Sequence, residues 1–222
     1  MIEEHTVDGV VTDPPYGIGF KYNTHEDSPI GYGAWLWSVI EQCERICRPG
    51  SPVVIWQAMS NIRHFAGWFP RDFRLFAAAK NFVQMRNTAL QHAFDPVVIW
   101  WTDGERYHSK TGGVNRDFHV SNSAKTVAET WALHVDHPCP RPLDTVEYII
   151  KHLVRPEGTI LDPFLGSGTT SVAARNLGRR CIGIEKDQKY VDVAVRRLKD
   201  AEGAGAVTEM RKQLAKTHKK HK

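Results

Sequence analysis

Two short segments of the chain carry residue types that could do chemistry. The first reads D-P-P-Y and comprises Asp13, Pro14, Pro15 and Tyr16. Consecutive prolines stiffen the backbone, so the Asp13 carboxylate and the Pro14 carbonyl would form a fixed pair of hydrogen-bond acceptors. Such a pair suits the two hydrogens of an exocyclic amine, and the Tyr16 ring offers a flat face for stacking on a heterocycle. Taken alone, the same four residues would be interpreted as a turn.

The second segment has the composition of a ligand-binding loop. It covers residues 161–170 and reads LDPFLGSGTT. Gly166 and Gly168 would let a ligand approach the backbone closely, and the N–H groups at the start of a following helix would face that ligand. Glu185 stands 17 residues after Gly168, where an acid can accept both hydroxyls of a ribose. The segment therefore predicts a nucleoside-containing ligand; the alternative is that the glycines only make a tight turn.

Two common nucleotide motifs do not match this loop. No Lys follows the glycines, as the phosphate loop G-x-x-x-x-G-K-[ST] requires, and Ser171 occupies the third-glycine position of the dinucleotide pattern. ATP and NAD are therefore disfavoured as the ligand.

Apolar patterns along the chain indicate the strands and helices that would position both segments. Strands are expected at residues 7–12, 53–56, 73–79, 96–101, 159–161 and 181–185, and helices at 35–47, 60–69, 143–153, 169–177 and 187–202. Ser60 and Asn61 suit the N-cap of the second helix, and Asp187 that of the last. Strands that alternate with helices predict an open, mostly parallel α/β sheet with helices on both faces. Both chemical segments follow a strand, and ligands bind at that edge of such a sheet.

Two stretches depart from this alternation. Residues 102–125 are rich in Gly, Asn, Ser, His and basic residues, which is typical of a long functional loop or of a disordered insertion. Residues 211–222 hold six Lys or Arg and no acid, more positive charge than the net +4 of the whole chain. Such a tail is either a solubilising end or an arm for a polyanion such as nucleic acid.

Length and composition limit the class of protein further. The 222 residues, 41% of them hydrophobic, suit one domain of medium size. No apolar run is long enough to span a membrane, and the first residues lack a signal-peptide pattern, so we expect a cytoplasmic protein with no membrane partner. Cys43 and Cys47 fall one helical turn apart among core positions, and without a second Cys/His pair no metal site is expected.

The chain resembles DNA amino-methyltransferases of the β type, which depend on S-adenosylmethionine (SAM). In that family a catalytic D-P-P-Y precedes a SAM-binding D-P-F-x-G-S-G, the order of residues 13–16 and 162–168 here. Residues 137–142 resemble the family's H-P-x-Q-K-P segment, with Pro140 and Arg141 in place of Gln and Lys, and residues 178–185 resemble its G-R-x-x-I-G-I-E. The resemblance covers nearly the whole chain.

This resemblance implies a Rossmann-like SAM-methyltransferase fold over residues 1–202, with a small target-recognition insertion at about residues 102–135. The basic composition of the C-terminal residues predicts a disordered tail at 203–222. The implied reaction moves a methyl group from SAM to the N6 amine of an adenine flipped out of double-stranded DNA. Asp13 and the Pro14 carbonyl would accept the hydrogens of the amine, and Pro15 and Tyr16 complete the implied catalytic set. The residues implied to bind the cofactor are Asp162, Pro163, Phe164, Gly166, Ser167, Gly168, Thr169, Thr170 and Glu185.

Alternatives to this reaction stay open. Cytosine-N4 enzymes of the family more often carry Ser in place of Asp13, which favours adenine over cytosine as the substrate. A DNA-binding protein with a degenerate SAM site and a methyltransferase for RNA or protein glutamine are further alternatives. The small insertion implies either a short recognition sequence or a homodimer that supplies more contacts. The resemblance also implies a bacterial or phage-encoded enzyme, either within a restriction-modification system or without a restriction partner.

Overall fold

The computed structural model describes residues 2–20, 27–67, 72–81, 93–109, 115–121 and 141–201. Each of the six expected strands is present, with small shifts at the ends. The strands are β1 (Gly9–Thr12), β2 (Pro52–Trp56), β3 (Arg74–Lys80), β4 (Phe94–Trp101), β5 (Phe118–Ser121), β6 (Thr159–Asp162) and β7 (Arg180–Gly183). The helices are α1 (Tyr32–Ile46), the short 3-10 helix η1 (Met59–Asn61), α2 (Ile62–Ala66), α4 (Leu143–Leu153), α5 (Thr169–Asn176) and a helix over residues 188–201.

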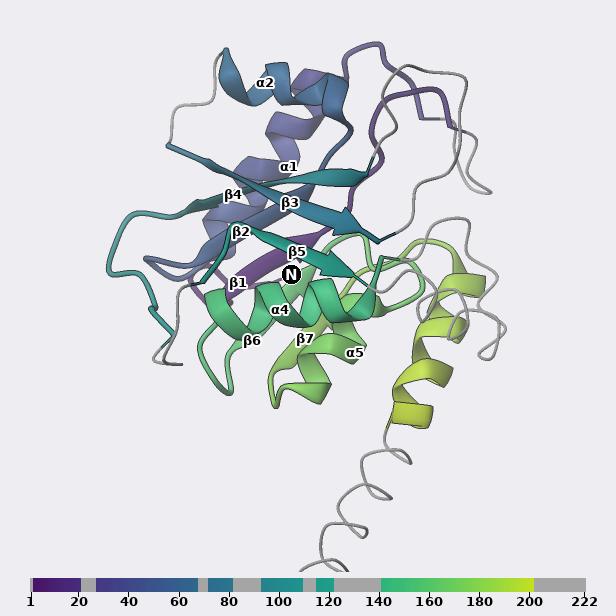
Figure 1. The fold of residues 1–222 in the computed structure, drawn as a ribbon. Helices are drawn as coiled ribbons and strands as arrows, with labels where there is room; N and C mark the ends of the chain where they lie inside the picture. Colours follow the sequence, from purple (N-terminus) through teal and green to yellow (C-terminus); the bar gives the residue numbers. More distant parts are fainter. Residues whose placement is uncertain are drawn as a thin grey trace, which may run out of the picture.

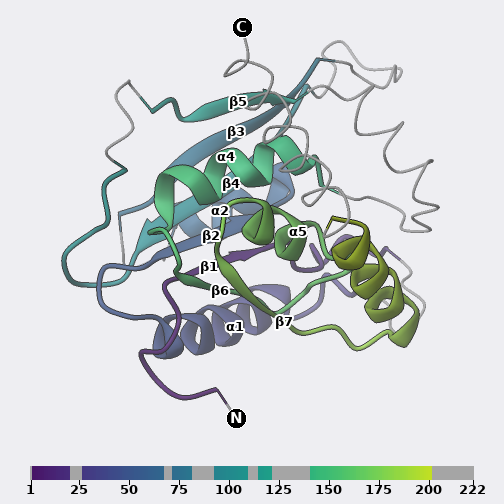
Figure 2. The same ribbon diagram turned by 90° about the horizontal axis from the view of Figure 1, so that it is seen from below.

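The strands form one open sheet in the order β5-β3-β4-β2-β1-β6-β7 (Figure 2). β1 is parallel to β2 and β6, β6 is parallel to β7, and β3 is parallel to β5. Among the described strands, only β4 is antiparallel to its neighbours, β2 and β3. The expectation of a mostly parallel α/β sheet is therefore confirmed.

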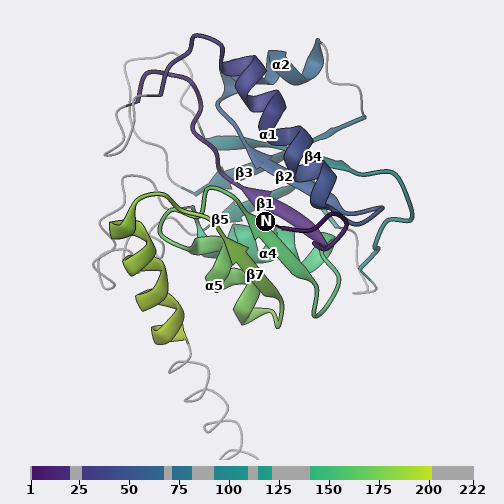
Figure 3. The same cartoon turned by 180° about the vertical axis from the view of Figure 1, so that it is seen from behind.

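Helices cover both faces of the sheet. Figures 1 and 3 show α1 and α2 on one face and α4, α5 and the helix at residues 188–201 on the other. Because side chains alternate along a strand, Val10 faces the α1 side and its neighbour Val11 the opposite side. Burial of a Leu or Ile side chain contributes about 1.5–3 kcal/mol, so these two apolar layers supply most of the stability. Within the described part of the chain, no helix is long and apolar enough to cross a membrane.

The cysteines expected in the core are buried there. Cys43 and Cys47 each expose 2% of their surface or less, in the layer between α1 and the sheet. Burial raises the pKa of the Cys43 thiol to about 12, so this thiol stays protonated near neutral pH. Both residues therefore act as small apolar side chains.

One strand was not expected. Residues 102–125 had been interpreted as a loop or a disordered insertion, and that is wrong for β5, which pairs in parallel with β3 over four positions. β5 lies at the edge of the sheet, and it exposes Phe118 and Val120, so its sequence lacks the continuous apolar run of a buried strand. The remaining described residues of this stretch, 102–109 and 115–117, contain no strand or helix.

The strand directions bring the chemistry to one edge. β1, β2, β6 and β7 point the same way, so their carboxyl ends meet, and the antiparallel β4 begins at that same edge. Asp13 follows β1, Asp95 stands at the start of β4, Asp162 ends β6 and Glu185 follows β7. Ligands bind at this edge in open α/β sheets.

Candidate active site

The D-P-P-Y loop leaves β1 and is held in place by residues from two other segments. The Asp27 carboxylate accepts the N–H groups of Gly17 and Ile18, at 2.7 and 3.0 Å. The Asn61 side-chain amide donates to the Tyr16 carbonyl at 2.6 Å. Gly17 adopts a φ of +65°, and a Cβ there would lie 2.5 Å from the Tyr32 ring, so this position requires glycine.

Asn61 does not have the role expected from the sequence. It was expected to cap a helix, but its side chain makes no cap hydrogen bond to α2. The amide instead contacts Tyr16 and also donates to Gln57 Oε1 at 3.1 Å, which in turn accepts the Tyr32 hydroxyl at 3.1 Å. The helix itself was expected to reach residue 69; α2 ends at Ala66, and residues 68–71 lie outside the described residues.

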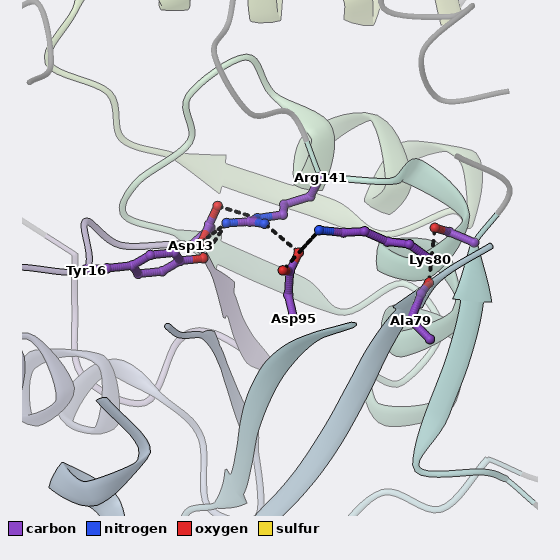
Figure 4. A network of polar contacts seen from close by, with 7 residues as sticks. Asp13, Tyr16, Ala79, Lys80, Asp95 and Arg141 are labelled. Carbon is purple, nitrogen blue, oxygen red and sulfur yellow. Dashed lines mark hydrogen bonds and ion pairs between the residues drawn. The ribbon is translucent and has the colours of Figure 1, made fainter. Parts of the chain in front are cut away.

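The Asp13 carboxylate is fixed by two side chains (Figure 4). The Tyr16 hydroxyl donates to Asp13 Oδ1 at 2.5 Å. The Arg141 guanidinium makes a bidentate contact with the same carboxylate, in which Nε donates to Oδ2 at 2.6 Å and Nη2 to Oδ1 at 3.0 Å. The Nη2 atom also donates to the Tyr16 hydroxyl. Burial, and then the charge of Asp13, raise the pKa of Tyr16 well above its ordinary value, so the hydroxyl stays protonated and donates.

Asp162 joins the two motif-bearing strands. It is only 3% exposed, and its Oδ1 accepts the Thr12 hydroxyl at 2.7 Å and the Phe164 N–H at 3.1 Å. Thr12 is the residue before Asp13, so one buried carboxylate links the end of β1 to the glycine loop after β6. Burial raises the pKa of Asp162 to about 6, and the hydrogen bonds from Thr12 and Thr170 oppose that rise.

The glycine loop is supported by Glu185 and by the last helix. Glu185 Oε2 accepts the Gly166 N–H at 2.9 Å. The Arg197 Nη1 donates to the Ser167 carbonyl at 2.7 Å and to the Thr169 hydroxyl at 3.2 Å. Gly168, with a φ of +84°, precedes the first residue of α5, so the loop runs directly into a helix N-terminus.

These residues fit a nucleoside-containing cofactor such as SAM. Glu185 and Phe164 are both partly exposed at neighbouring strand ends, where a ribose and a flat base could reach them. The Trp35 ring, 38% exposed, meets the Phe164 ring edge-on with centroids 5.7 Å apart. Gly166 and Gly168 both have positive φ values, 51° and 84°, which bend the backbone between them.

The structure therefore brings most of the expected site residues to one edge of the sheet. The D-P-P-Y loop follows β1, and the glycine loop follows the neighbouring β6. Ser167, Gly168, Thr169 and Thr170 are buried within the loop and the start of α5, whereas Pro163 and Gly166 are half-buried. Sequence reasoning did not single out Asp27, Asp95 or Arg197, and it gave Asn61 a different role. The H-P-C-P-R-P segment drew attention to position 141 without indicating its partners.

The sheet and its two adjoining loops define a Rossmann-like methyltransferase fold. A family model described as DNA methylase, N6_N4_Mtase, matches residues 7–196. The chain belongs to this DNA methylase family.

Curated relatives of the chain are bacterial type II methyltransferases. The chain is 28% identical to M.BglII of Bacillus subtilis over 87% of its own length, and 23% identical to M.HpaI of Haemophilus parainfluenzae over 89%. It spans 64% and 69% of the lengths of those relatives. Among solved structures it is similar to the M1.HpyAVI–SAM complex, with a TM-score of 0.65, 25% identity and coverage of 87% of this chain and 90% of that chain. The cytosine-N4-specific PvuII DNA methyltransferase shares the fold, with a TM-score of 0.68, 18% identity and coverage of 88% and 80%.

Proposed function

We propose that this protein is a site-specific DNA methyltransferase that transfers a methyl group from SAM to the N6 amine of adenine in double-stranded DNA. The Thr12–Asp162 hydrogen bond carries this proposal, because it fixes the D-P-P-Y loop beside the glycine loop. A methyl donor on one loop and an amine on the other would then lie next to each other. Membership of the DNA methylase family and similarity to a SAM complex support the same reaction.

The D-P-P-Y loop binds and orients the amine. The nitrogen lone pair of an exocyclic amine is conjugated into the ring, which makes it a weak nucleophile. Acceptance of its two hydrogens by the Asp13 carboxylate and the Pro14 carbonyl favours a pyramidal nitrogen whose lone pair points at the methyl group. The nitrogen would take the methyl group while the sulfur of SAM keeps the bonding electrons and leaves as a neutral thioether, and the methylated amine would then release one proton to solvent. Alignment of the two reacting groups supplies much of the rate.

The glycine loop and Glu185 would hold the cofactor. SAM, when bound, supplies a methyl group made electrophilic by the sulfonium. Glu185 would accept ribose hydroxyls while it keeps the Gly166 N–H, and Phe164 would pack on the adenine with Trp35 behind it. Asp162 lies beneath the loop and sets its position relative to Asp13.

The choice of adenine rests on Asp13. A carboxylate here is the acceptor found in the D-P-P-Y motif, whereas cytosine-N4 enzymes more often carry a Ser at this position. Tyr16 lies beside Asp13 and supplies the ring for a stacked base (Figure 4). The same contacts with the amine of cytosine would give N4-methylcytosine, so the identity of the product distinguishes the two substrates.

A methyl-transfer assay tests the proposal. Purified protein is incubated with labelled SAM and mixed unmethylated DNA, and the nucleosides are then identified by mass spectrometry. We expect N6-methyladenine. Asp13→Asn keeps the shape of the side chain and exchanges one acceptor oxygen for a donor group, so we expect a loss of more than about 100-fold in rate. Asp200→Asn makes the same change at an exposed position on the helix at residues 188–201 and serves as the control.

Each result has a defined meaning. N4-methylcytosine as the product would refute the choice of base and keep the reaction. The absence of any methylated base from protein that binds SAM in titration calorimetry would refute DNA as the substrate, and methylated RNA in a competition assay would replace it. Full activity of Asp13→Asn would refute the role of the carboxylate.

A further inference from the structure

The Arg141 guanidinium lies at the centre of a chain of alternating charges. On one side it forks onto the Asp13 carboxylate and contacts the Tyr16 hydroxyl. On the other side its Nη1 donates to Asp95 Oδ2 at 3.0 Å. Lys80 completes the chain with its ammonium 2.9 Å from Asp95 Oδ2. Figure 4 shows the charges in a row across the ends of the strands, in the order Lys80, Asp95, Arg141, Asp13.

The members of this row come from distant parts of the sequence. Asp13 follows β1, Lys80 ends β3, Asp95 begins β4, and Arg141 precedes α4. The side chain of Arg141 is only 13% exposed, and those of Asp13 and Asp95 are each 26% exposed. Charge-assisted hydrogen bonds between such half-buried groups are stronger and more directional than surface ion pairs.

The geometry leaves Asp13 able to accept an amine hydrogen. A carboxylate has about four lone-pair positions, two on each oxygen. Oδ1 accepts two donors, from Tyr16 and from Arg141 Nη2, whereas Oδ2 accepts one, from Arg141 Nε. Oδ2 therefore keeps capacity for one further donor. The bidentate fork fixes the plane of the carboxylate, and that plane sets the direction from which the last donor can approach.

We propose that Arg141 is a positioning residue that fixes the Asp13 carboxylate for the target amine, and that Asp95, held by Lys80, fixes Arg141 in turn. The inference rests on the proposed function, and it applies to an adenine or a cytosine amine alike. Lys at position 141 would keep the charge without the planar fork, so Arg and Lys are not equivalent at this position.

The direction in which the rate changes when Arg141 is replaced distinguishes this positioning role from the opposite, blocking role. The Arg141 guanidinium is planar and donates hydrogen bonds through its N–H groups, as the target amine does, so it could instead occupy the place of the target base. If Arg141 blocks the base in this way, its removal raises the rate. If it positions Asp13, its removal lowers the rate.

The test measures kcat and KM for wild-type protein and for Arg141→Gln, Arg141→Lys, Asp95→Asn and the double variant Arg141→Gln/Asp95→Asn. We expect kcat to fall about 10- to 100-fold for Arg141→Gln and less for Arg141→Lys. Asp95→Asn should lower kcat about 3- to 10-fold. The double variant should match Arg141→Gln, because Asp95 acts through Arg141. The dissociation constant for SAM, measured by titration calorimetry, should change less than about twofold, since the residues proposed to bind the cofactor lie at or after the ends of β6 and β7, whereas the hydrogen bonds of Arg141 described above run to the D-P-P-Y loop and to Asp95.

Arg45→Gln serves as the control. Arg45 lies near the C-terminal end of α1 and forms a surface ion pair with Glu4, so kcat should not change. An increased or unchanged kcat for Arg141→Gln overturns the inference, as does a double variant whose loss equals the product of the single losses. If Arg141→Gln melts below the assay temperature, Arg141→Lys and Asp95→Asn decide, and wild-type kcat in both overturns it. Wild-type protein that makes no methylated base overturns the proposed function itself, whereas active wild type with unaffected variants overturns the positioning role alone.

Discussion

Asp162 is a buried carboxylate, and its replacement by Asn should change how the stability of the protein depends on pH. The group is 3% exposed, and its pKa is raised from 3.8 to about 6, chiefly by burial. Between these two values the folded protein keeps a proton that the unfolded chain has released. The contribution of the protonated Asp162 carboxyl group to stability is therefore complete below about pH 4, and it is lost as the pH rises through about 6.

The size of the effect follows from the two pKa values. The difference between 3.8 and about 6 corresponds to about 3 kcal/mol, at about 1.4 kcal/mol per pKa unit. Between pH 5 and pH 7.5 the wild type should lose about 1 kcal/mol of this contribution. Asn has the same shape, and its Oδ1 can still accept the Thr12 hydroxyl and the Phe164 N–H. Asn does not ionise, so the Asp162→Asn variant has no such loss.

Urea denaturation at the two pH values and constant ionic strength measures the difference. The free energy of unfolding of Asp162→Asn minus that of wild type should increase by about 1 kcal/mol from pH 5 to pH 7.5, which shifts the relative Tm by about 2–4 °C. Asp117→Asn, at an exposed position, controls for the loss of one negative charge. A difference that stays constant or decreases with pH would show that Asp162 does not carry the cost of a buried charge.

Three further outcomes are expected. Glu185→Gln should raise the dissociation constant for SAM about tenfold in titration calorimetry, because the carboxylate that accepts the Gly166 N–H loses its charge; equal affinity would contradict its place in the cofactor site. Gly168 and Gly178 both have positive φ, but a Cβ at position 168 would lie 2.7 Å from the Ala194 Cβ, whereas a Cβ at position 178 would meet nothing within 4 Å. In thermal unfolding, Gly168→Ala should therefore lower the free energy of unfolding by at least about 1 kcal/mol more than Gly178→Ala, and equal losses would contradict this packing argument. Deletion of residues 211–222, which lie outside the described residues, should weaken DNA binding and reduce its salt slope by up to about 5 in fluorescence anisotropy, and an unchanged slope would make the tail a solubilising end.

The local parts of the site could be predicted from the sequence. The D-P-P-Y and glycine segments each follow an apolar strand, and the change from strand to helix periodicity marks where the chain turns. Gly168 and the start of α5 fall at the expected positions, and Asp187 accepts the Lys189 N–H at 3.0 Å as an N-cap should. These features depend on residues close together in the chain, so patterns of neighbouring residues determine them.

The contacts that complete the site could not be predicted in this way. Arg141 and Asp13 are 128 positions apart, and Thr12 and Asp162 are 150 apart. No periodic pattern relates such pairs, because the contact exists only once the strand order is known. Asn61 shows the limit at short range as well, since its residue type suits a helix cap, but its side-chain amide donates to the Tyr16 carbonyl and makes no cap hydrogen bond.

The direction of β4 explains why the charge row can form at all. β4 runs antiparallel to β2, with Val97 opposite Trp56, so its first residues lie beside the carboxyl end of β2 and close to the D-P-P-Y loop. Asp95 is the second residue of β4. A parallel strand in the same place would carry Asp95 toward the opposite edge of the sheet, about 17 Å away at about 3.3 Å per residue. Arg141 would then lack its ion pair with the Asp95 carboxylate. The one reversed strand in this part of the sheet therefore brings to the D-P-P-Y loop the counter-charge that holds Arg141 in position.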